Sequence, residues 1–244
     1  METFVVLSTC DLSLMPDIET LRTHMQRLAA VTAVFAVEYG ESQFSFDPRW
    51  HKRQQMASNI NGCGDELYIH FAPHGCYIKG FAHESEMSPY KDAARTIWPG
   101  IVDSVPPEFA SSLSEPAFDP DATTFVIWRL HPAAEWSSGD VDYPDGDYKD
   151  GSADLLEPIT FTVENVTEWL SENYETDVDS EIVRSVFNDR PLTDSQMAKL
   201  NPTSPLHSIR DAVRATGWRP QSADNMVFTP VSYTHLTLPT IYSV

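Results

Sequence analysis

Near the N-terminus, apolar residues recur at intervals of three and four positions, which is the spacing of one face of an α-helix. Asp17 stands just before this pattern, and its carboxylate can cap the first turn of a helix. The pattern therefore predicts a helix over residues 17–30. Its apolar positions are Ile18, Leu21, Met25 and Leu28.

The next part of the chain has short apolar segments separated by Gly, Asn and Pro, a pattern typical of antiparallel strands joined by tight turns. It predicts a β-meander over residues 34–81 and a further strand over Thr124–Leu130, inside a β-rich region that spans residues 34–130. Six prolines between residues 82 and 123 exclude long helices from that stretch.

Helical spacing returns after an acidic loop that covers residues 137–157, and it predicts a helical region over 162–217. The order of helix, strands and helices predicts an α+β fold with an antiparallel sheet, not alternating βαβ units. We expect one such domain over residues 1–220. The four C-terminal helices are predicted over about 163–174, over 180–188, from Thr193 with the spacing of a capping box, and from Ser204 to Thr216.

The end of the chain differs in composition from the rest. No Asp, Glu, Lys or Arg follows Asp224, although 21% of the chain is charged. The final residues, Val231–Val244, also resemble a translated sequencing-adapter sequence that recurs at the ends of unrelated genes. We therefore treat 221–244 as a tail that is not native from residue 231, and leave it out of the fold prediction. The alternative is a genuine C-terminal strand.

The chain is strongly acidic, with 36 Asp and Glu residues against 16 Lys and Arg residues and a formal net charge of -20. This balance argues against binding to nucleic acid, because neutralising phosphates needs clustered Lys and Arg. It also argues against docking on an anionic membrane surface. A basic protein is the partner that such a charge favours.

Fifteen of the acidic residues, but only three basic ones, lie between Asp140 and Arg190. Within this stretch four glutamates repeat at i+4 and i+3, so we expect them to share one face of a helix. Two interpretations stay open, because such a face can be merely solvated or can recognise a basic protein partner. The four residues are Glu164, Glu168, Glu172 and Glu175.

The three cysteines, Cys10, Cys63 and Cys76, do not form the pattern of a disulfide framework. We interpret them as free thiols in a reducing cytoplasm, with a Cys63–Cys76 pair as the alternative. No Lys or Arg precedes Arg22, and the longest apolar run, Leu28–Val37, has ten residues. A signal peptide needs a basic start, and a bilayer span needs about 20 apolar residues. The sequence therefore predicts a cytoplasmic protein.

Residues that can bind metal gather between Cys63 and His83, where the spacing C-x6-H-x3-H-x-C includes His70, His74 and Cys76. This spacing matches no zinc pattern, because zinc sites use paired short spacings. We interpret the histidines as turn and surface residues, and we expect no cofactor.

The acidic loop contains four aspartates at short intervals, which suggests a calcium loop. The register of an EF-hand fails, because a loop that starts at the first of them has Pro144 at the fifth position. A divalent-cation site of another kind and a solvated acidic turn both stay open. The aspartates are Asp140, Asp142, Asp145 and Asp147.

The sequence contains no G-x-S-x-G, P-loop, G-x-G-x-x-G or H-E-x-x-H motif. The remaining candidate for catalysis is a hydrolase-type site in the turn region, with Asp65, His83 and Glu84 as acid–base residues. Trp50 and Tyr90 would form its pocket walls. The simpler interpretation is that these are structural turn residues, next to glycines that a tight hairpin turn requires.

Several short segments of the sequence are distinctive. They include Ser45-Phe46-Asp47, Gln55-Met56-Ala57-Ser58, Asn61-Gly62, Gly64-Asp65, Ile78-Lys79-Gly80-Phe81, His83-Glu84-Ser85, Met87-Ser88-Pro89-Tyr90, Trp98-Pro99-Gly100, Asp103-Ser104-Val105-Pro106, Glu115-Pro116-Ala117-Phe118, Ile127-Trp128-Arg129, Gly139-Asp140-Val141 and Tyr143-Pro144. Together they resemble a family of uncharacterised bacterial proteins, and the resemblance covers most of residues 17–220. It implies a native end near residue 220 and no particular activity. Cys63 and Cys76 are not part of the family's pattern, which weakens a zinc site further.

Three functional hypotheses follow from the sequence. The first is an acidic cytoplasmic protein that binds other proteins, such as an immunity- or antitoxin-like partner of a basic effector. The second is a hydrolase-type enzyme that uses Asp65, His83 and Glu84. The third is a module that binds a divalent cation in the loop Asp140–Asp147.

Overall fold

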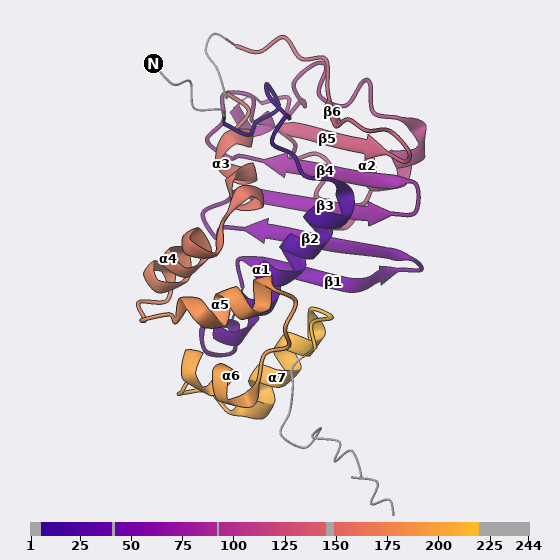
Figure 1. Cartoon of the computed structure of the whole chain (residues 1–244). Coiled ribbons are helices and arrows are strands. Elements are labelled where there is room, and N and C mark those ends of the chain that lie inside the picture. Colours follow the sequence, from indigo (N-terminus) through magenta and orange to yellow (C-terminus); the bar gives the residue numbers. More distant parts are fainter. Residues whose placement is uncertain (1–5, 41, 92, 145–148, 220–244) are drawn as a thin grey trace, which may run out of the picture.

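The computed structural model describes residues 6–219, apart from residues 41, 92 and 145–148. Its centre is a six-stranded antiparallel sheet in which the strands lie side by side in chain order (Figure 1). A long helix precedes the sheet and further helices follow it, so the predicted α+β fold with an antiparallel meander is confirmed. The strands are β1 (Phe44–His51), β2 (Gln54–Ile60), β3 (Glu66–Ala72), β4 (Gly75–Phe81), β5 (Phe125–Leu130) and β6 (Ser137–Ser138).

Helix α1 (Ile18–Tyr39) crosses one face of the sheet and is longer than predicted (Figure 1). Residues 34–39 continue the helix, so their assignment to the meander is wrong. Every residue from Leu28 to Phe35 is buried, because β1 packs against one side of the helix and three later helices pack against others, namely α5 (Ser180–Phe187), α6 (Asp194–Leu200) and α7 (Leu206–Ala215). A helix buried all round loses the alternation of apolar and polar positions that identifies it in a sequence.

The C-terminal helices pack along α1 and follow their predicted positions closely. The capping box at Thr193 is present, since its Oγ1 accepts a hydrogen bond from the backbone N–H of Gln196 at 3.2 Å. The predicted acidic loop 137–157 contains two elements that the sequence did not reveal, the short strand β6 and the short helix α3, and η4 begins at its last residue. The helices are α3 (Ser152–Leu156), η4 (Glu157–Thr160), α4 (Val163–Asn173), α5 (Ser180–Phe187), α6 (Asp194–Leu200) and α7 (Leu206–Ala215).

Strand β1 continues through Asp47-Pro48, although a proline within a run of strand residues is typical of a break. Proline lacks a backbone N–H, and an edge strand such as β1 can accommodate it because one side of the strand needs no partner. The pairing of β1 with β2 shifts register between Asp47 and His51. The turn that follows places Arg53 in left-handed backbone conformation, with φ of 61°.

The second face of the sheet is covered by residues 82–123, which form only short helical turns, in agreement with their many prolines. Phe109 and Phe118 from this segment are fully buried against the sheet. Phe118 stacks on Trp50 and on Tyr68, with ring centroids 5.8 and 5.2 Å apart. The turns are η1 (Pro89–Lys91), η2 (Pro107–Phe109), α2 (Ala110–Leu113) and η3 (Pro116–Phe118).

Lys79, in the middle of β4, is buried on this second face. Its side chain is 1% exposed, and its Nζ has no hydrogen-bond partner among the described residues. The Nζ lies 5.5 Å from the ring centroid of Tyr68 and 5.7 Å from that of Phe81, at cation–π distance. Burial lowers the pKa of Lys79 to about 8, although the carboxylates of Glu66 and Asp119 act in the opposite direction.

We expect Lys79→Met to raise the free energy of unfolding at neutral pH by roughly 1–3 kcal/mol, because it removes a buried amine that lacks an acceptor. The gain is expected to shrink as the pH rises from about 8 to about 10. Over this range the unfolded lysine binds more protons than the folded one, so the protein with Lys79 becomes more stable. Urea unfolding of both proteins across this pH range measures the difference. A variant that is less stable at neutral pH, or a gap that does not change with pH, would contradict the expectation.

Candidate functional site

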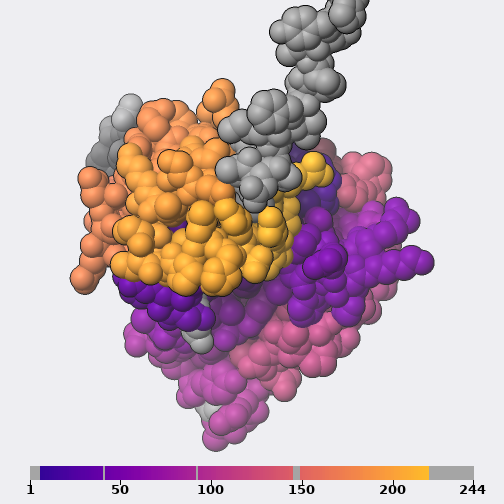
Figure 2. Space-filling view, turned by 90° about the horizontal axis from the view of Figure 1, so that it is seen from below, coloured from indigo at the N-terminus to yellow at the C-terminus, as the bar shows by residue number. Residues whose placement is uncertain are grey.

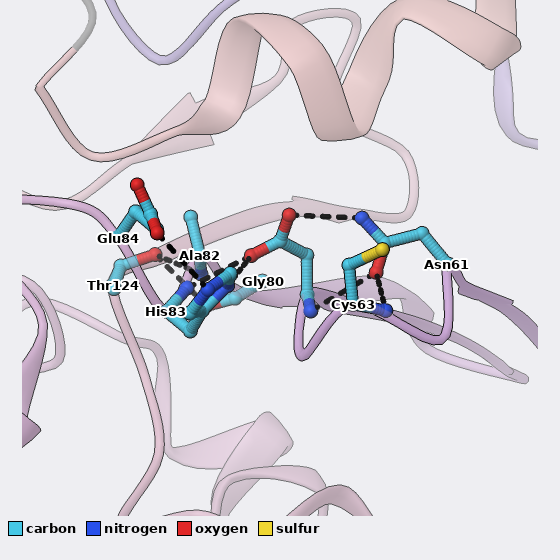
Figure 3. A network of polar contacts seen from close by, with 8 residues as sticks. Asn61, Cys63, Gly80, Ala82, His83, Glu84 and Thr124 are labelled. Atoms are coloured by element: carbon cyan, nitrogen blue, oxygen red, sulfur yellow. Dashed lines mark hydrogen bonds and ion pairs between the residues drawn. The ribbon is translucent and has the colours of Figure 1, made fainter.

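The sheet brings Asp65 and His83 together, although they are far apart in the sequence. Asp65 directly precedes β3 and His83 follows β4, and these two strands pair with Glu66 opposite Phe81. The Oδ1 of Asp65 lies 2.8 Å from Nδ1 of His83 and accepts a further hydrogen bond from its backbone N–H at 2.8 Å (Figure 3). Two of the three predicted acid–base residues therefore form a direct pair.

The turn between β2 and β3 holds Asp65 in place. Asn61 donates from Nδ2 to Oδ2 of Asp65 at 2.9 Å, and its Oδ1 accepts from the backbone N–H groups of Cys63 at 2.8 Å and Asp65 at 3.2 Å (Figure 3). Gly64 has a φ of 104°, and a Cβ at this position would lie 3.2 Å from Cγ of His83. A glycine is therefore required both by the turn and by the approach of the imidazole.

Hydrogen bonds decide the ionisation of Asp65. Partial burial raises the pKa of this carboxyl, but the side chain and backbone of His83 and the amide of Asn61 together lower it more, so the pKa lies below its usual value. The carboxylate thus stays charged at neutral pH and orients the imidazole through Nδ1.

Glu84 takes a looser position than the other two predicted residues. Its Oε1 lies 3.6 Å from Nε2 of His83, and its side chain is 87% exposed. In the described part of the chain, no hydroxyl or thiol forms a hydrogen bond with Nε2 of His83. The geometry therefore contains an oriented imidazole, the arrangement that acid–base catalysis uses, but no nucleophile beside it.

A cleft opens next to Asp65, between the β2–β3 turn and the segment α3–η4–α4. It has a volume of about 160 Å³, and none of its lining residues is Lys or Arg. Trp50 and Tyr90, expected as pocket walls, are not among the lining residues: Trp50 stacks on Phe118, and Tyr90 packs against Phe81. We call this the acidic cleft, after its charged and aromatic lining residues Asp65, Asp154, Glu157, Phe161 and Trp169.

The glutamate face predicted on one helix is only partly formed. Glu164, Glu168 and Glu172 lie exposed on α4, but Glu175 lies beyond its end, in left-handed backbone conformation with φ of 48°. The helix ends at Asn173, close to its predicted end, and the next residue, Tyr174, turns inward and stacks on Phe35 with ring centroids 4.4 Å apart.

Ion pairs distinguish the four glutamates further. Arg184 donates to Glu164 at 2.9 Å and pairs with Glu181 at 3.3 Å, so the charge of Glu164 is largely neutralised. Glu168, Glu172 and Glu175 have no ion-pair partner within the described residues. They provide the uncompensated negative charge on this side of the molecule.

The residues of the C-x6-H-x3-H-x-C pattern do not converge. His70 is buried on the second face of the sheet, where Ser112 and Gln54 lie 2.8 and 3.0 Å from its two ring nitrogens. Burial lowers its pKa to about 4, so it is neutral. Cys76 points into the core on the opposite face, and Cys63 is exposed in the β2–β3 turn. In the described ranges, no group of three or more His, Cys, Asp and Glu residues could hold a metal ion.

The predicted cation loop is described only in part. Asp140 and Asp142 are exposed, and the carbonyl oxygen of Asp142 accepts a hydrogen bond from the indole N–H of Trp98 at 3.0 Å. Asp145 and Asp147 lie outside the described residues, as does the tail 221–244.

The chain matches no family model, no curated protein and no solved structure. The resemblance to a family of uncharacterised bacterial proteins therefore stays a prediction. No helix among the described residues combines the length and the apolar character that crossing a membrane requires.

Asp154, Glu157 and Trp169 are residues of the acidic cleft that were not predicted from the sequence. Asp154 and Glu157 lie in a segment that was predicted as a loop. Trp169 lies in a predicted helix, where the pattern gives it only the role of an apolar residue. The high density of acidic residues after Asp140 was the one sequence feature that could have indicated these residues. Only the fold shows that this acidic segment lies next to Asp65.

We expect Asp65→Asn to lower the free energy of unfolding at neutral pH by about 1–3 kcal/mol, because the charge-assisted hydrogen bonds to His83 are lost. Since the folded pKa of Asp65 lies below the unfolded value, its contribution is present above about pH 4 and is lost as the pH falls through the folded pKa. Chemical unfolding at neutral and acidic pH measures this.

The matched control is Asp121→Asn at an exposed position, for which we expect a change within about 0.5 kcal/mol. Equal stability losses in the two variants, or a loss at Asp65 that persists in acid, would refute a special role of this carboxylate.

Proposed function

We propose that the protein binds a basic protein partner, and that an arginine or lysine side chain of this partner enters the acidic cleft. The observation that carries the proposal is the lining of the cleft, where three carboxylates and two aromatic rings meet without a basic residue. The volume of about 160 Å³ is smaller than typical small-molecule sites of roughly 300–1,000 Å³. Such a cleft suits a single long side chain.

The chemistry of the cleft favours a cation. Asp154 and Glu157 are exposed and have no ion-pair partner within the described residues, so they are available as acceptors. Trp169 supplies an indole, the aromatic group that attracts Arg and Lys most strongly. A charged side chain held between carboxylates and aromatic walls is the kind of anchor that carries much of the free energy of a protein interface.

The surroundings of the cleft extend the same charge. Glu172 follows Trp169 by three positions and lies on the same side of α4, with Glu168 on the neighbouring strip of the helix. With a net charge of -20, the protein attracts a basic partner from a distance and accelerates the encounter. Neutralising a basic effector in the cytoplasm, as an immunity protein or antitoxin does, is a role that this mode of binding would serve.

The test uses a defined probe, the peptide Ac-Gly-Arg-Gly-Arg-Gly-Arg-NH2, titrated into isotope-labelled protein. We expect saturable binding that shifts the indole signal of Trp169, assigned with Trp169→Phe. We expect the double variant Asp154→Asn/Glu157→Gln to weaken binding about five- to tenfold, because both acceptors are lost without a change in side-chain shape.

Two controls separate the cleft from general electrostatic attraction. The variant Glu108→Gln/Asp121→Asn changes the net charge equally at exposed positions outside the cleft and is expected to change the affinity less than about twofold. A peptide with citrulline in place of arginine is expected not to bind. Equal weakening by both double variants, or binding of the citrulline peptide, would refute the proposal.

A second candidate is hydrolase-type catalysis by His83, which the 2.8 Å contact between its Nδ1 and Asp65 favours. Hydrolysis of p-nitrophenyl acetate by the natural protein and by His83→Gln tests it. If His83 is the catalytic base, we expect His83→Gln to lower the rate at least about tenfold. Loss of a general base typically lowers the rate by more than this. Equal rates in the two proteins would eliminate this candidate.

A further inference from the structure

A second cleft lies at the opposite end of the sheet from the acidic cleft. It is formed by the first turn of α1, the start of β2, the segment after β3 and His131, and its volume is about 350 Å³. This volume falls in the range of small-molecule sites. Its lining includes Arg22, Arg53 and Gln54. We call it the arginine cleft.

Basic residues are concentrated at this edge of an otherwise acidic protein. The end of β1 and the β1–β2 turn carry Arg49, Lys52 and Arg53 within five positions that contain no Asp or Glu. The hairpin projects beyond the layer formed by α6 and α7 (Figure 2). The side chain of Arg53 is exposed and has no hydrogen-bond or ion-pair partner in the described part of the chain.

Arg22 is held in a fixed position. One end of its guanidinium group pairs with Glu19, and the carbon centre of the group lies 5.2 Å from the ring centroid of Phe71. Its Nε is buried without an acceptor among the described residues, while the side chain as a whole is 26% exposed. A guanidinium that is already immobilised loses little conformational entropy when it binds a ligand.

A buried chain of hydrogen bonds orients Gln54. The carbonyl Oε1 of Gln54 is 3.0 Å from Nε2 of His70, which therefore donates, and Nδ1 of His70 accepts from the hydroxyl of Ser112 at 2.8 Å. This contact holds the Gln54 side chain on the second face of the sheet with His70, whereas Phe71 and Arg22 lie on the first face. The groups of the arginine cleft that can bind an anion are therefore the two guanidinium groups of Arg22 and Arg53, and Gln54 forms part of its wall.

We infer that the arginine cleft binds a small molecule through an oxyanion group, either a carboxylate or a phosphate. Guanidinium groups match both oxyanions through paired N–H donors. Phe71, Pro48 and Pro73 provide apolar walls for the body of the ligand. The carboxylate of Glu19 opposes binding, although Arg22 partly neutralises it. This site is independent of the acidic cleft and of the function proposed there.

Calorimetric titration of the full chain with sodium benzoate and with sodium phosphate, at constant ionic strength, tests the inference. We expect saturable binding of at least one probe with a Kd below about 5 mM, and Arg53→Gln to weaken it at least about fivefold. Binding of benzoate alone identifies a carboxylate site, and binding of phosphate alone identifies a phosphate site. Binding of both identifies a general oxyanion site.

Two further variants distinguish binding in the arginine cleft from a general electrostatic effect and from an effect of misfolding. Lys52→Gln removes the same charge from the same turn but at a residue that does not line the cleft, and we expect less than about twofold change. Glu19→Gln removes the opposing carboxylate, and we expect about two- to fivefold tighter binding, a gain that a damaged fold cannot produce. Absence of saturable binding for both probes, or equal effects of Arg53→Gln and Lys52→Gln, would overturn the inference.

Discussion

The burial of helix α1 on every side is the constraint on which the rest of the fold depends. Eight consecutive residues of this helix, from Leu28 to Phe35, are removed from water. Three of them are alanines, which let β1 and α7 pack closely against the helix. The polar member, Thr32, is satisfied, because it donates to the carbonyl of Leu28 at 2.9 Å and accepts from Ser42 at 2.9 Å. Each large apolar side chain buried in this way contributes about 1.5–3 kcal/mol.

The antiparallel meander then decides which side chains can meet. Successive turns of a meander alternate between the two ends of the sheet, so the β2–β3 turn and the β1–β2 turn lie at opposite ends (Figure 1). At one end Asp65, which binds His83, meets the acidic segment of α3, η4 and α4. At the other end the β1–β2 turn meets the start of α1 and places Arg53 near Arg22. The two clefts therefore follow from one topology.

Local sequence patterns predicted the parts of this fold that local interactions determine. The helices after residue 162 carry caps and an amphipathic period, and the β2–β3 turn carries glycine at positions 62 and 64, where φ is positive. The second half of α1 escaped prediction because its burial is set by partners from distant segments. The expectation that Glu175 shares the helix face failed for the same reason, since Tyr174 leaves the helix to stack on Phe35.

The same distinction between local and distant interactions applies to the candidate sites. Asp65 and His83 were predicted as acid–base residues because of their side-chain chemistry and their position beside a turn. The pairing of β3 with β4 explains their contact. Nothing in the sequence indicated a binding role for Trp169, Asp154 or Arg22. Each of them is a residue type that is common at such a position of a helix. Their importance arises from side chains far away in the chain, which a single sequence does not specify.

Charge separation along the sheet lets one small protein hold two opposite electrostatic environments. Strand β2 has seven residues, so its two ends are roughly 20 Å apart at about 3.3 Å per residue. The Debye length at physiological ionic strength is about 8 Å, so each end is largely screened from the other. The basic partner that we propose would thus be attracted to the acidic end with little repulsion from the β1–β2 turn. An oxyanion at the arginine cleft is likewise shielded from most of the negative charge carried by α4, and the two surfaces can act independently.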